Sequence, residues 1–202
     1  MSEIFSWILA NYFELLGTIL SIVYLVFSIK QSILLWPLGL ISSAIYVYIF
    51  LQAGIYADMG LQIYYVLISI YGWYYWKKMQ GKSNAHAPVK SVFETTYLKI
   101  VLLILTGLIV LILAQLLILF TDSNIPYLDA FITGLSITAT WMLAKKYIEH
   151  WIVWIIVDSV SAGVYFYKEL YITIILYTIY AILAVAGYKV WKKEFKPLVP
   201  IV

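Results

Sequence analysis

The sequence predicts an all-α membrane protein with seven transmembrane helices, arranged as a parallel repeat of three helices, one linking helix and three more. Three observations predict it: an apolar composition, seven apolar runs of spanning length, and two halves that resemble each other. Of the 202 residues, 64% are hydrophobic and 11% are charged, whereas soluble domains carry about 25% charged residues. Little sequence is left for a separate soluble domain.

The seven runs are long enough for membrane-spanning helices. They cover Tyr12 to Ile29, Ser32 to Gln52, Ile55 to Trp76, Leu98 to Phe120, Ile125 to Ala144, Ile148 to Tyr167 and Leu170 to Val190. With seven crossings, twelve of the thirteen lysines fall on one side of the membrane and only Lys168 on the other. Positive charge favours the cytoplasmic side, so we expect a multi-pass protein of the cell inner membrane, with the N-terminus outside and the C-terminus cytoplasmic.

The two halves match at a constant offset of 115 residues, without a gap, when 12–78 is laid on 127–193. Matches of Leu and Ile carry little information in an apolar chain, but paired Trp, Gly and Lys do. The informative pairs are Trp36/Trp151, Gly72/Gly187, Trp76/Trp191, Lys77/Lys192 and Lys78/Lys193. An internal repeat follows. Both halves then have the same orientation, as in transporters with parallel repeats, although the repeat could also serve only as a scaffold.

The segments around the repeats complete the expected organisation. We expect residues 1–11, which lack the positive charge of a signal peptide, to form an interfacial segment. Residues 79–97 are predicted as a cytoplasmic linker, because they are polar and contain Gly81 and Pro88. Residues 98–120 form the linking transmembrane helix, and residues 194–202 form a C-terminal tail.

The sixth predicted helix carries the main candidate site. Trp151, Trp154 and Asp158 are spaced i, i+3 and i+7, so all three fall on one side of a helix. The carboxylate lies in the middle of an apolar run, where a charge costs about 2.5 to 3.5 kcal/mol. A flat cation held between indoles and countered by Asp158 is one candidate partner. The alternatives are an interfacial position for Trp151 and a hydrogen bond from Asp158 to a neighbouring helix.

The other candidates come from the first half and the last helix. Trp36 matches Trp151, but Gly39 and Ser43 stand opposite Trp154 and Asp158, so the recognition groups are expected mainly in the sixth helix. The run from Trp36 to Gly39 is expected to supply close packing and a bend. The remaining candidates lie on one face of the third helix, or on its counterpart in the seventh: Asp58, Gln62, Tyr65 and Tyr180. Hydrogen bonding or packing between helices is the alternative for each.

Composition and spacing exclude several chemistries. The chain has no Cys and only two histidines, His86 and His150, so metal and haem sites are poorly supported. Asp158 has no acid or base partner nearby in sequence, so we expect no enzyme and no cofactor. A retinal receptor needs a lysine buried in the last helix, and residues Leu170 to Tyr188 contain none. With a single deep carboxylate, substrate-selective passive passage is favoured over ion coupling.

At this level of detail the chain resembles the PnuC family of bacterial vitamin transporters from Tyr12 to Lys193. The resemblance rests on Trp36-Pro37-Leu38-Gly39, the run from Ile55 to Gln62, the run from Ser69 to Trp76, and the Trp-x-x-Trp-x-x-x-Asp pattern of Trp151, Trp154 and Asp158. The family has a three-plus-one-plus-three arrangement of helices. By resemblance, the three residues of that pattern line the substrate site, and Gln62 faces it from the third helix.

The resemblance also implies an activity. Family members are facilitators for nicotinamide riboside, or for thiamine and other ring-bearing vitamins and nucleosides. The substrate moves down its gradient and is trapped inside by a cytoplasmic kinase, and such proteins are often homotrimers. This chain departs from relatives that have Asn at the position of Asp158, which changes the charge of the pocket. An alternative of another class is a structural membrane subunit, whose buried polar residues would serve only to hold helices together.

Overall fold

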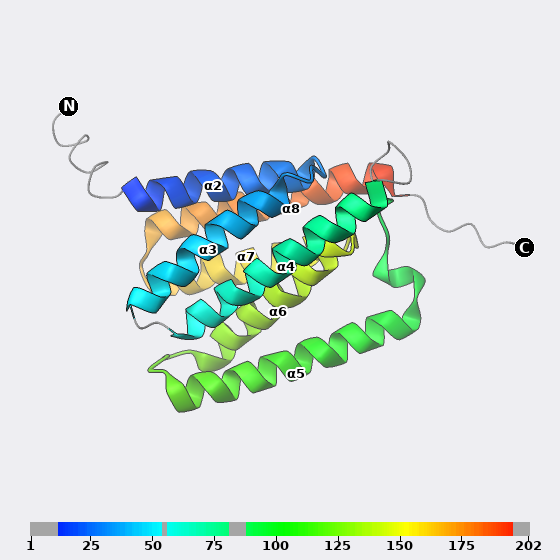
Figure 1. Ribbon diagram of the computed structural model, residues 1–202. Helices are drawn as coiled ribbons and strands as arrows, with labels where there is room; N and C mark the ends of the chain where they lie inside the picture. Colours follow the sequence, from blue (N-terminus) through cyan, green and yellow to red (C-terminus); the bar gives the residue numbers. More distant parts are fainter. Residues whose placement is uncertain (1–11, 54–55, 81–87, 196–202) are drawn as a thin grey trace, which may run out of the picture. The chain divides into compact units, whose positions relative to one another are not determined.

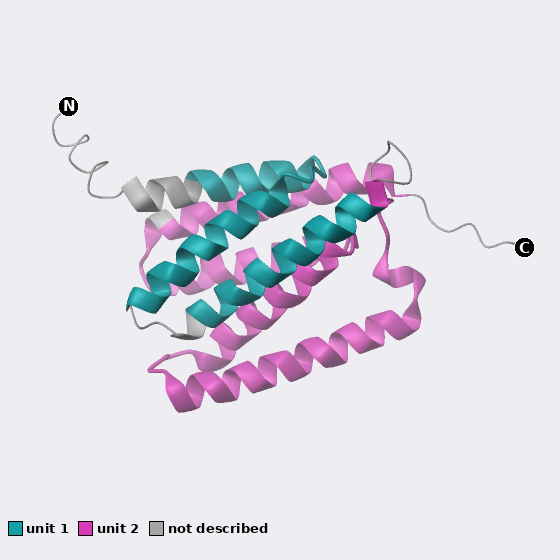
Figure 2. Ribbon diagram, in the orientation of Figure 1, with its two compact units in different colours: residues 1–78 teal, residues 79–202 magenta. Residues whose placement is uncertain are grey.

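The computed structural model describes residues 12–53, 56–80 and 88–195. The chain divides into two compact units, Met1–Lys78 and Met79–Val202, which are coloured separately in Figure 2 and described one at a time. The predicted interfacial segment 1–11, most of the predicted tail 194–202 and the linker residues 81–87 lie outside the described residues.

The described residues form seven α-helices and one short 3-10 turn (Figure 1). The helices of the first unit are α2 (Tyr12–Ile29), α3 (Leu35–Ala53) and α4 (Tyr56–Gln80). The second unit contains η1 (Val92–Glu94), α5 (Thr96–Phe120), α6 (Pro126–Ala144), α7 (His150–Tyr167) and α8 (Tyr171–Glu194). The prediction of an all-α fold with seven helices is confirmed.

Four of these helices have windows long and apolar enough to cross a membrane: Leu35–Gln52, Thr96–Phe120, His150–Tyr167 and Thr173–Glu194. A shorter apolar segment, Ile19–Ile29, belongs to α2. Apolar side chains cover much of the exposed surface of α5, where Leu103, Leu111 and Leu119 are each more than half exposed. In a soluble protein such a surface would be costly to hydrate, whereas lipid tails accept it.

Helices α3 and α7 begin later than predicted for a local reason. Gln31 and Lys146 adopt left-handed φ values of 52° and 61°. Each ends its helix and forces the next few residues into a turn. As a result, α3 begins at Leu35 rather than Ser32, and α7 begins at His150 rather than Ile148.

The same turn is built twice, at positions separated by 115 residues. The Ser32 amide donates to the Phe27 carbonyl at 2.9 Å, and the Tyr147 amide donates to the Met142 carbonyl at 2.9 Å. These bonds span five residues and satisfy carbonyls that a helix C-terminus otherwise leaves unpaired. The correspondence supports the predicted repeat at the level of single hydrogen bonds.

A second duplicated feature fixes the helix after each turn. A Cβ added to Gly72 would lie 2.4 Å from Trp36 Cζ2, and one added to Gly187 would lie 2.5 Å from Trp151 Cζ2. The indoles therefore rest directly on the backbone of the neighbouring helix, α4 in the first unit and α8 in the second. A further tryptophan meets each indole edge-on: Trp76 at 5.4 Å and 88°, and Trp191 at 5.9 Å and 84°.

The linking helix α5 packs against α6 within the second unit. Gly134 allows this approach, because a Cβ there would lie 2.6 Å from Val110 Cγ2. The hydroxyls of Thr106 and Thr138 are hydrogen-bonded at 2.8 Å between the same two helices. Small residues and hydroxyl pairs of this kind hold helices together in lipid.

Candidate functional site

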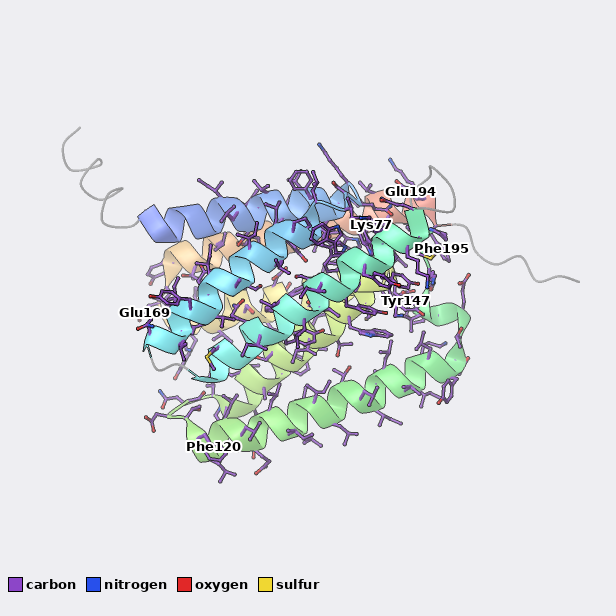
Figure 3. The ribbon with its side chains drawn as sticks, viewed as in Figure 1. Lys77, Phe120, Tyr147, Glu169, Glu194 and Phe195 are labelled. Carbon is purple, nitrogen blue, oxygen red and sulfur yellow. The ribbon has the colours of Figure 1, made fainter. Side chains whose placement is uncertain are left out.

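Helix α7 carries three of the predicted site residues, Trp151, Trp154 and Asp158. Its two ends can be found in Figure 3 from Tyr147, in the preceding loop, and Glu169, in the following turn. Trp151 and Asp158 are buried, and Trp154 is half-buried. A single rigid helix therefore sets the spacing of the three side chains.

Asp158 lies near the middle of α7 and is 6% exposed. No lysine among the described residues of its own unit forms an ion pair with it. The hydroxyl of Tyr177, on α8, is close enough to the carboxylate for an electrostatic interaction. A buried carboxylate that lacks a fixed cation suits a mobile cation as its partner.

The ring of Tyr177 contacts two further tyrosine rings. Its ring stacks on Tyr165 of α7 at 5.1 Å and 24°, and meets Tyr180 of α8 edge-on at 5.8 Å and 73°. The predicted candidate Tyr180 therefore lies one ring away from the neighbour of Asp158. Together these residues form a carboxylate beside a group of aromatic rings, an arrangement that attracts a flat cation through both charge and ring quadrupoles.

Sequence reasoning missed Tyr177 as a site residue. The signal was present, since an offset of 115 places Tyr177 opposite Gln62 and Asp158 opposite Ser43. The polar candidate Gln62 of the third predicted helix thus has an aromatic counterpart, Tyr177, in the seventh. The ring of Tyr177 contacts that of Tyr180.

Trp151 makes packing contacts in this structure. It is 1% exposed, rests on Gly187, and has the ring of His150 at 4.5 Å. Its indole nitrogen has no hydrogen-bond partner in the described part of the chain, and the same is true of its counterpart Trp36. A contact between substrate and Trp151 or Trp36 stays a prediction, while the observed contacts fix α3 and α7 against their neighbours.

Trp154 occupies a position that holds a glycine in the first unit. A Cβ on Gly39 would lie 3.2 Å from both Ser69 Oγ and Tyr24 Cε2, so a larger side chain there would have to displace these neighbours. In the second unit the counterparts of Tyr24 and Ser69 are the buried alanines Ala139 and Ala184. The exchange of sizes leaves space for the indole and makes this part of the second unit different in shape.

The remaining candidates belong to α4 of the first unit. Gln62 and Tyr65 are half-buried, and the Tyr65 ring lies 5.6 Å from that of Tyr64 at 56°. Asp58 falls within α4, but its side chain lies outside the described residues. The predicted roles of Gln62, Tyr65 and Asp58 therefore stay predictions.

The described residues offer carboxylate, hydroxyl and aromatic groups, but no group of three His, Cys, Asp or Glu side chains placed to hold a metal ion. Carboxylate and aromatic groups recognise ligands through charge and shape. The carboxylate and aromatic groups of the second unit thus have the chemistry that recognises a flat cation.

Comparisons with known proteins agree with this chemistry. The chain is 24% identical over 208 aligned residues to the nicotinamide riboside transporter PnuC of Escherichia coli strain K12, covering 92% of this chain and 85% of that protein. It is 25% identical over 180 residues to the riboflavin/roseoflavin transporter RibM of Streptomyces davaonensis, covering 88% of this chain and 83% of RibM.

A solved structure shows the same fold. The crystal structure of the vitamin B3 transporter PnuC superposes with a TM-score of 0.74 at 21% identity, covering 96% of this chain and 86% of that one. The model of one transporter family, described as nicotinamide mononucleotide transporter, matches residues 11–193. The resemblance to PnuC is therefore confirmed, and the protein is a membrane transporter rather than an enzyme: it belongs to the nicotinamide mononucleotide transporter family.

Proposed function

We propose that the protein carries nicotinamide riboside into the cell by facilitated diffusion. The observation that carries the proposal is Asp158, a buried carboxylate without a lysine partner in the described part of its unit. It lies near Tyr177, whose ring contacts that of Tyr180. The pyridinium ring of nicotinamide riboside is flat and positively charged. It offers the charge that Asp158 lacks and a face for the aromatic rings.

Each candidate residue has a proposed role. Asp158 counters the positive ring, Trp154 stacks on it, and Trp151 and Trp36 shape the walls of the site. The polar groups of Gln62 and Asp58 bind the ribose hydroxyls: the Gln62 amide can donate and accept, and the Asp58 carboxylate accepts. The aromatic candidates Tyr65 and Tyr180 enclose the ligand.

The proposed transport is passive. Asp158 is the one carboxylate found deep in an apolar helix of the described chain, so a relay of ionisable groups across the membrane is not supported. Net uptake then requires removal of the free substrate inside, and phosphorylation by a cytoplasmic kinase would achieve it because the phosphate adds negative charge. We place the protein in the inner membrane as a homotrimer.

Thiamine is the second candidate substrate, because its thiazolium ring is also a flat cation that suits Asp158. Riboflavin, named for the relative RibM, has a neutral ring system, and a buried carboxylate gives it no electrostatic advantage. A structural subunit is the alternative of another class. It requires Asp158 and the tyrosines to serve helix packing alone.

Uptake by proteoliposomes tests the proposal. Purified protein is reconstituted, and the entry of labelled nicotinamide riboside, thiamine and riboflavin is measured with and without an ion gradient. We expect saturable entry of nicotinamide riboside that an ion gradient does not drive. Faster entry of thiamine would make thiamine the assigned substrate. A requirement for an ion gradient would contradict passive transport, and no entry of any compound would support the structural subunit.

A further inference from the structure

Residues 88–95, here named the strap, lie against the loop that leads into α7. The Lys90 amide donates to the Lys146 carbonyl at 2.9 Å, and the Ile148 amide donates to the Lys90 carbonyl at 2.9 Å. This pairing forms a parallel bridge between Lys90 and Tyr147. Because Val89 and Val92 are also buried, the part of the predicted linker nearest α5 is a built element of the second unit.

One side chain fastens the strap. Glu149 is 6% exposed, and its carboxylate accepts hydrogen bonds from the Ser91 hydroxyl and, at 2.9 Å, from the Val92 amide. Ser91 also caps η1 by accepting the Phe93 amide at 3.1 Å. Each oxygen of this buried carboxylate has a donor, and losing either donor leaves one oxygen without a hydrogen bond in a dry environment.

The position of Glu149 connects the strap to the site. Glu149 is the N-cap residue of α7, two positions before Trp151. Since α7 is one continuous helix to Tyr167, a shift or rotation of its first turn is passed to Trp154 and Asp158. The strap thus holds the N-terminal end of α7, the helix that carries the proposed recognition residues.

In the described part of the first unit, no carboxylate fastens the corresponding turn. The counterpart of Glu149 at an offset of 115 is Leu34, which is 53% exposed and carries no polar group in its side chain. The turns around the two positions are otherwise alike, with the Trp36 and Trp151 amides donating to Ile33 and Ile148 at 3.2 Å. The carboxylate is therefore not needed to build this turn, and it needs another explanation.

We propose that Glu149 is a positioning residue for substrate recognition: by binding Ser91 and Val92 of the strap, it sets the orientation of α7 and of Trp154 and Asp158 on it. This inference rests on the proposed transport function for its substrate readout. Its structural part can be measured without any substrate.

Four variants test the proposal. Glu149→Ala removes both bonds, and Ser91→Ala removes one. Glu149→Gln keeps the shape, with its oxygen accepting from Val92 and its amide donating to the Ser91 oxygen. Leu34→Ala is the matched control in the first unit. We measure the half-saturating concentration and the maximal rate in proteoliposomes, for the compound that the wild type transports best.

The half-saturating concentration should rise about tenfold for Glu149→Ala, as expected for a lost charge-assisted hydrogen bond, and less for Ser91→Ala. Glu149→Gln should stay within about twofold of the wild type, and Leu34→Ala should be unchanged. The proposal is overturned if Glu149→Ala lowers only thermal stability or the amount of protein while its half-saturating concentration is normal. It is equally overturned if Glu149→Gln is as impaired as Glu149→Ala.

Hydrogen exchange separates this proposal from the proposed function. Amides in the first two turns of α7 should exchange faster in Glu149→Ala than in Glu149→Gln, with no ligand present. If that difference appears and no vitamin is transported, the substrate assignment fails and the fastening stands. Equal exchange in the two variants would refute the fastening, whatever the substrate.

Discussion

Replacing Gly187 by alanine should destabilise the second unit, because Trp151 occupies the space of the new methyl group. The added Cβ would lie 2.5 Å from Cζ2 and 2.6 Å from both Cε2 and Cη2 of the indole. Carbon atoms in good contact are about 3.5 to 4.0 Å apart, so the ring or the helix has to move by about 1 Å. The ring centroids of His150 and Trp191 lie 4.5 and 5.9 Å from that of Trp151, and these neighbours restrict the movement of the indole.

Overpacking of this kind costs about 1 to 3 kcal/mol. For a chain of this length that lowers the melting temperature by about 2 to 12 °C. The assay is thermal unfolding of purified protein in detergent. Gly72→Ala repeats the perturbation in the first unit, where the added Cβ would lie 2.4 Å from Trp36, and it should cost a similar amount.

Gly163→Ala is the control. Gly163 is a glycine inside a helix of the same unit, α7, but nothing lies within 4 Å of its added Cβ. Alanine favours a helix over glycine by up to about 1 kcal/mol, so this variant should be as stable as the wild type or more so. If Gly187→Ala has the same melting temperature as Gly163→Ala, the indole of Trp151 is not locked against α8, and the packing argument is wrong.

Three further outcomes follow from single contacts. Burial lowers the pKa of Lys146 to about 8, so between that pH and about 10.4 the unfolded chain binds more protons than the folded one, and the free energy of unfolding rises with pH. The stability of the wild type relative to Lys146→Gln, which copies Gln31 of the first unit, should therefore increase from pH 8 to pH 10, and a flat difference would contradict it. Thr106→Val removes the 2.8 Å bond to Thr138 and should lower stability by about 1 kcal/mol in thermal unfolding, with substrate affinity unchanged. Trp154→Ala should weaken substrate quenching of tryptophan fluorescence beyond the loss of one fluorophore, and preserved affinity would remove Trp154 from the site.

The fold was predictable because lipid imposes a simple pattern on sequence. Each membrane helix must be an apolar run of spanning length, so the bounds of α2 agree with the prediction and those of α6 differ by one residue. The repeat was visible because Trp and Gly recur at a fixed offset. The reason for the paired Trp and Gly residues appears only in the three-dimensional structure, where Gly72 and Gly187 make room for an indole.

The site was predictable only in part. Asp158 stands out in sequence because a carboxylate in an apolar run is costly. Tyr177 does not, because it is one of nineteen tyrosines and its neighbours are brought together by the packing of α7 on α8. Glu149 lies next to a lysine-containing turn and has the sequence environment of a surface charge, while its partner Ser91 lies 58 residues away. Local patterns carry no information about such a contact.

The most direct test of the account compares two ligands that differ in charge. Binding of nicotinamide riboside and of its reduced, uncharged form is measured by titration calorimetry with the wild type and with Asp158→Asn. We predict that the wild type prefers the cation by about tenfold or more, and that Asp158→Asn loses this preference while remaining folded. Equal preference in both proteins would contradict the claim that Asp158 recognises a cation.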